Sequence, residues 1–91
     1  MRNVDDKQIA ERLVAIITPG DDSITGMIRA GEDIAAVVTL VEMAAQARQP
    51  IPEALRAAVQ AMVDEDAFDA EERRAVVEDL ATLADLTPSR T

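Results

Sequence analysis

The sequence predicts an all-α protein, a compact bundle of four to five helices. Apolar residues recur at spacings of three and four in several segments, the spacing of one face of a helix. The apolar content is 48%, which excludes a disordered chain, and it comes almost entirely from Ala, Val, Leu, Ile and Met. Phe68 is the sole aromatic residue. An aliphatic, Ala-rich composition favours closely packed helices over a β-sandwich.

Residues 32–48 are expected to form the central helix of the bundle. Apolar side chains cover most of its circumference, and only Thr39, Glu42 and Gln46 mark a narrow polar strip. A helix of this kind must be covered on several sides, by other segments or by a second copy of the chain. Because a short chain buries a modest fraction of its surface, we predict a symmetric homodimer.

Three further helices are predicted from periodicity and from their start and stop signals. The first spans 4–17 and ends before Pro19, because the residue before a proline avoids the α conformation. The next spans 52–63, with Pro52 at its first position. The last spans 70–85, and Asp69 and Glu72 have the spacing of a capping box at its start. We expect 88–91 to be a frayed tail of the single domain 1–91.

Two interpretations are open for residues 22–48. In the first, a short helix over 23–30 ends at Gly31, and the central helix begins after it. In the second, one long helix runs through the whole stretch, with Gly31 on its apolar side. Gly26 and Gly31 each cost about 1 kcal/mol inside a helix. The first interpretation is therefore favoured.

Composition limits the classes of function. The formal net charge is −9, so the chain repels nucleic-acid phosphates and direct nucleic-acid binding is not expected. His, Cys, Tyr and Trp do not occur in the sequence, which removes the commonest catalytic and transition-metal ligands. We expect no enzymatic activity, no cofactor and no metal. An apolar leader is not seen at the N-terminus, and the central apolar run is too short to cross a bilayer. A cytoplasmic location is predicted.

The acidic residues give the predicted binding surface. Carboxylates gather in two stretches, one before the short helix and one before the last helix: Asp21, Asp22, Asp64, Glu65, Asp66 and Asp69. The second stretch does not match a calcium-binding EF-hand loop, because Phe68, Asp69 and Ala75 fall at positions that need a ligand, a glycine and a bidentate glutamate. The sequence predicts a small interaction module of bacterial or phage type, an adaptor, inhibitor or regulator. Its expected partner is a basic or nucleic-acid-binding protein.

An alternative function comes from Gly20-Asp21-Asp22-Ser23-Ile24. This stretch resembles the Gly-x-Asp-Ser-Leu/Ile signature of acyl and peptidyl carrier proteins, which are small, acidic four-helix domains. The resemblance implies phosphopantetheine on Ser23. The chain departs from the family because Ile17 precedes Ser23 by only six positions, where the family has a long loop. A second register, over Gly31-Glu32-Asp33-Ile34, places Asp33 at the position of the serine.

Phe68 has two possible roles. A large apolar side chain within an acidic loop is expected to be a core plug that fixes the loop between the last two helices. The other role is an exposed anchor for a partner.

Overall fold

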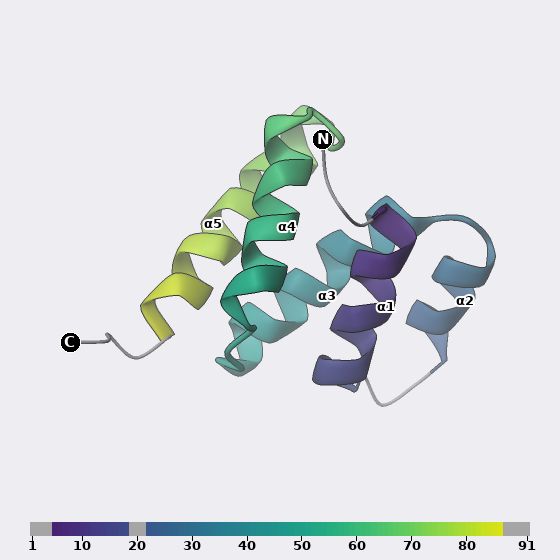
Figure 1. Cartoon of the computed structure of the whole chain (residues 1–91), viewed down its shortest axis with the longest axis horizontal. Coiled ribbons are helices and arrows are strands. Elements are labelled where there is room, and N and C mark those ends of the chain that lie inside the picture. Colours follow the sequence, from purple (N-terminus) through teal and green to yellow (C-terminus); the bar gives the residue numbers. More distant parts are fainter. Residues whose placement is uncertain (1–4, 19–21, 87–91) are drawn as a thin grey trace.

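Five α-helices make up the described part of the chain in the computed structural model, which describes residues 5–18 and 22–86. No strand occurs among these residues, so the all-α prediction is confirmed. The predicted frayed end, 88–91, lies outside them. Figure 1 shows the order of the helices, which have these bounds: α1, Asp6–Ile17; α2, Ser23–Arg29; α3, Asp33–Ala47; α4, Glu53–Asp64; α5, Ala70–Leu86.

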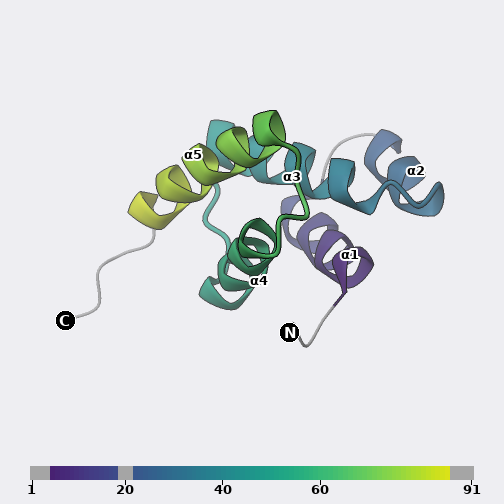
Figure 2. The ribbon, with the colours of Figure 1, turned by 90° about the horizontal axis from the view of Figure 1, so that it is seen from above.

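The central position of α3 is confirmed. It contacts α1, α2 and α5, whereas α4 packs against α1 and α5 (Figure 2). Val37 and Val41 of α3 are completely buried. Glu42 and Gln46 of the predicted polar strip are exposed, and so is Ala47 at the end of the helix. The chain thus provides internally most of the burial for which a second copy was expected, and the homodimer stays a prediction.

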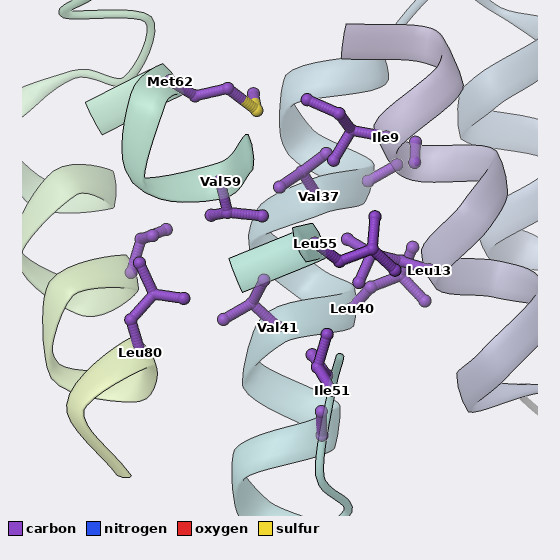
Figure 3. Close-up of a cluster of buried hydrophobic side chains, with 14 of the residues drawn as sticks. Ile9, Leu13, Val37, Leu40, Val41, Ile51, Leu55, Val59, Met62 and Leu80 are labelled. Atoms are coloured by element: carbon purple, nitrogen blue, oxygen red, sulfur yellow. The ribbon is translucent and has the colours of Figure 1, made fainter. Parts of the chain in front are cut away.

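The core lies where side chains from α1, α3, α4 and α5 meet (Figure 3). Leu13 of α1, Leu40 of α3 and Met62 of α4 are all completely buried. The described residues that are buried are all hydrophobic. The radius of gyration is 12.3 Å, the value of about 12 Å expected for a compact chain of this length. Packing of apolar stripes therefore holds the bundle together.

Residues 22–48 form two helices, as the first interpretation had it. Gly31 has a φ of 83°, a left-handed conformation that glycine adopts without a steric penalty. Its N–H donates to the carbonyl of Ile28 at 3.1 Å, and the N–H of Glu32 donates to that of Met27 at 2.8 Å. These two bonds are those of a Schellman motif, which satisfies the last carbonyls of α2. The chain then turns into α3.

Three predicted helix starts differ from the structure by one or two residues, and α3 begins at Asp33 where 32 had been predicted. Helix α1 begins at Asp6, two positions later than the predicted start, because Asp5 forms a capping box. Its carboxylate accepts from the Gln8 N–H at 2.8 Å, and the Gln8 side chain accepts from the Asp5 N–H at 3.3 Å. Pro52 had been predicted as the first residue of α4, but it is the N-cap residue, and the helix begins at Glu53. These shifts move the helix boundaries and leave the set of predicted helices unchanged.

The connector between α3 and α4 takes part in the packing. Arg48 adopts a left-handed φ of 53° and ends α3. The Gln49 side-chain amide donates to the carbonyl of Ile16 at 2.8 Å, where α1 is ending and its carbonyls lack helical partners. Ile51 is only 2% exposed, and its carbonyl accepts from Nε of Arg56 at 3.2 Å. The connector therefore belongs to the packed structure, although it lies between the predicted helices 32–48 and 52–63.

Candidate functional site

The acidic turn between α4 and α5, residues 64–69, presents four exposed carboxylates. Asp64 is the last residue of α4, Glu65 and Asp66 form the turn, and Asp69 precedes α5. Asp66 has a φ of 62°, a conformation that aspartate tolerates better than most residues. Its N–H donates to the Val63 carbonyl at 3.1 Å, which closes the end of α4. The structure thus places these four predicted binding residues together on one short segment.

The far side of the acidic turn is fixed by the predicted capping box. The Asp69 carboxylate accepts from the Glu72 N–H at 2.7 Å, and the Glu72 carboxylate accepts from the Asp69 N–H at 3.1 Å. Arg73 on the first turn of α5 forms an ion pair with Asp66 at 3.2 Å. Both side chains are well exposed, so this pair contributes only weakly to stability. The pair still joins α5 to the middle of the turn.

Phe68 anchors the acidic turn to the core. Its residue exposure is 4%, which confirms the core-plug prediction and contradicts an exposed anchor. Ala67 beside it is partly buried and packs against the core. Two apolar residues therefore point inward from a segment whose carboxylates face water. The carboxylates are carried on a turn that is held by the core and by capping at both ends.

The other predicted acids lie elsewhere. Asp22 is exposed at the start of α2, and its side chain makes no capping hydrogen bond to that helix. Asp21 lies outside the described residues. Figure 1 shows the start of α2 at the lower right and the acidic turn at the top of the molecule. The structure therefore does not bring Asp22 together with the carboxylates of the acidic turn.

Ser23, the residue implied by the resemblance to carrier proteins, is the first residue of α2 and is exposed. A modifying enzyme needs such exposure. Only residues 18–22 separate it from α1, so the long loop of the carrier family is replaced by a short connection. In the second register, Asp33 is the first residue of α3 and occupies the position of the serine. A carboxylate there cannot carry the prosthetic group.

A second group of carboxylates lies between α3 and α5. The pKa of Asp79 is raised above its ordinary value of 3.8, first because burial disfavours the charged form and then because Glu42 and Glu78 lie nearby. Glu42 belongs to α3, so this repulsion acts across the packing of α3 on α5. This repulsion could not be predicted from the sequence, because Glu42 and Asp79 are distant along the chain.

Replacing Asp79 with Asn is expected to stabilise the fold at neutral pH, by no more than about 0.5 kcal/mol because water screens a partly exposed carboxylate. A raised folded-state pKa favours the protonated form in the native state. The stability that the folded protein gains from protonated Asp79 is therefore fully present below the ordinary carboxyl pKa. It is lost as the pH rises through the raised pKa of the folded state. Urea unfolding at several pH values should show the gain at pH 7 and its disappearance below 3.8. An equal gain from Asp85→Asn would show that net charge alone is responsible.

A groove between α1 and α2 was not anticipated from the sequence. It has a volume of about 260 Å³ and is lined by Lys7, Glu11, Val14, Thr25, Ile28 and Arg29. Each helix contributes residues of one face, at spacings of three and four. Val14 is an apolar residue outside the α1 stripe of Ile9, Leu13 and Ile17, and its position was the signal that could have indicated a second contact surface.

The described residues show neither a metal-binding group nor a membrane-spanning helix. Among the described residues, no group of three or more acidic side chains is arranged to hold a metal ion. Within the same ranges, no helix has the length and apolar character that a bilayer crossing needs. A scan against protein-family models, a search of curated proteins and a search of solved structures each found no match to this chain.

Proposed function

We propose that this chain is a non-enzymatic interaction module that binds a basic protein partner through the acidic turn. The observation that carries the proposal is the presentation of Asp64, Glu65, Asp66 and Asp69. All four are exposed on one turn whose ends are capped and whose Phe68 is buried. A partner with Lys and Arg side chains, such as a nucleic-acid-binding protein, has the complementary charge.

Preorganisation supports the acidic turn over the other acidic surfaces. Binding is weakened by the entropy lost when a flexible segment becomes ordered, and a turn that is already fixed avoids much of this loss. Two acids at the start of α5, Glu71 and Glu72, extend the negative field of the turn. The positive charge of Arg73 is partly compensated by its ion pair with Asp66. A concentrated negative field steers a basic partner and accelerates encounter. Burial of Phe68 favours electrostatic steering over an aromatic anchor.

The experiment compares two variants with the same change in net charge. In the turn variant, Asp64→Lys and Glu65→Lys reverse two exposed charges of the acidic turn. In the control variant, Glu53→Lys and Asp85→Lys reverse two exposed charges elsewhere. Affinity capture from the native host should enrich a basic protein on the original chain and on the control variant. The turn variant should lose it.

Kinetics with the captured partner extend this test. Association with the turn variant is expected to be about tenfold slower at low salt, with a flatter dependence on ionic strength. The same result for both variants would assign the effect to net charge and would contradict a site at the acidic turn. Equal enrichment of the same proteins on all three chains would also contradict it.

We do not propose the carrier function for this chain. The exposure of Ser23 favours it, but the short connection over residues 18–22 departs from the family in the segment that holds the modified serine. The homodimer and the cytoplasmic location stay predictions. Neither is needed for the proposed binding.

A further inference from the structure

The groove between α1 and α2 combines an apolar floor with two cations. Val14 is partly buried and Ile28 is 9% exposed, and these side chains supply the hydrocarbon surface. Lys7 and Arg29 are exposed. The helices lie side by side in both views (Figures 1 and 2) and are joined by a short connection. The two helices run in opposite directions in Figure 1, so Lys7 near the start of α1 and Arg29 at the end of α2 lie toward the same end of the groove.

The polar side chains of the groove form no ion pair or side-chain hydrogen bond with other described residues. Within residues 5–18 and 22–86, the ammonium group of Lys7 and the guanidinium group of Arg29 make no ion pair, and the Thr25 hydroxyl makes no hydrogen bond. Glu11 stands one helical turn after Lys7, and its carboxylate also has no ion-pair partner in those ranges. Two cations and one carboxylate therefore line this groove, in a chain whose net charge is −9.

These features together select one class of ligand. The two cations and the hydroxyl favour an anion that accepts hydrogen bonds, as a carboxylate does. The floor of Val14 and Ile28 favours a hydrocarbon group attached to that anion. Glu11 penalises a ligand with a second negative charge, which disfavours a phosphate dianion. The volume of about 260 Å³ is space for about nine water molecules, so the ligand is small.

We propose that this groove binds a small aliphatic monocarboxylate, with its carboxylate between Lys7 and Arg29 and its hydrocarbon chain over Val14 and Ile28. Hexanoate, with about eight non-hydrogen atoms, has a suitable size, and a shallow site of this kind gives a dissociation constant of about 1 mM. The groove is lined by residues of α1 and α2, whereas the acidic turn joins α4 to α5, so this binding does not depend on the proposed partner interaction.

The test is a titration of the full chain with hexanoate, followed by methyl NMR spectra. Saturable shifts are expected at the methyl groups of Val14, Thr25 and Ile28. Hexylamine has the same chain length and the opposite charge, and it should give no saturable shift at these methyls. Shifts that fail to saturate with hexanoate, or equal binding of both compounds, would overturn the proposal.

Three variants make the test specific, and their spectra also report that the fold is intact. Arg29→Gln is expected to weaken hexanoate binding by about threefold, because one cation is removed. Glu11→Gln is expected to strengthen it by about threefold, because a repulsive charge is removed. Arg12 lies on α1, next to Glu11 in the sequence, but it does not line the groove. Arg12→Gln should therefore leave hexanoate binding unchanged. Weakening by Glu11→Gln, or an effect of Arg12→Gln as large as that of Arg29→Gln, would contradict the proposed ligand position.

Discussion

Replacing Phe68 with Ala is expected to lower the free energy of unfolding by about 3–4 kcal/mol. Phe68 is 4% exposed and is the large apolar side chain that attaches the acidic turn to the core. Its removal takes away buried apolar area and leaves a cavity that the bundle fills only in part. A domain of this size has a total stability of about 5–14 kcal/mol. Urea unfolding should therefore show a much lower midpoint.

The Phe68 variant also tests the link between packing and the proposed binding surface. Loosening the turn should weaken capture of the basic partner at a temperature where the rest of the variant is folded, because its carboxylates are no longer held in one arrangement. Phe68→Leu is the matched control, since it keeps an apolar plug and should retain most of the stability and the binding. An unchanged unfolding midpoint in Phe68→Ala would contradict the buried position of the ring.

Periodicity and local start signals were sufficient to predict the helices. Each stripe of apolar residues at spacings of three and four became a buried helix face, because burial of such a stripe provides most of a helix's stability in a protein. Asp69 and Glu72 could be identified because a capping box needs only residues three apart. Gly31 had a local signature as well, since a Schellman motif favours glycine at its left-handed position.

Features that depend on distant parts of the chain could not be predicted. Ala84 lies four residues after the buried Leu80 of α5 but is exposed, because it lines an open groove between α4 and α5. Ile51 lies between Pro50 and Pro52, outside any helix, but its side chain is buried in the core. The repulsion between Glu42 and Asp79 and the groove between α1 and α2 each need two helices to be brought together. Spacing within one segment carries no information about such pairs.

The candidate site could be predicted only in part, because the sequence shows which residues are close along the chain and not which distant residues meet. Carboxylates that are close in sequence, from Asp64 to Asp69, lie on one turn, and the turn could be identified from the helices on either side of it. Asp22 had been joined to them only by its charge, and it lies at the start of a different helix. A shared residue type therefore predicts a common surface only where the chain itself keeps the residues together.

Replacing Leu40 with Ala is expected to destabilise the protein by about 3 kcal/mol. Leu40 is completely buried on the central helix, among side chains of α1 and α4 (Figure 3). Since α3 contacts three other helices, a cavity at its middle cannot be closed by moving one neighbour, and the cost should stay near the middle of the usual range. The measurement is the shift of the urea midpoint at constant slope.

Val77→Ala provides the contrast that makes the Leu40 result informative. Val77 lies on α5 and is 44% exposed, so removing its two methyl groups should change stability by no more than about 0.5 kcal/mol. If α3 is the helix that the others cover, the Leu40 variant must lose several times more stability than the Val77 variant. Equal losses in the two variants would mean that the middle of α3 is no better packed than the outer face of α5. The architecture argued from its apolar circumference would then be wrong.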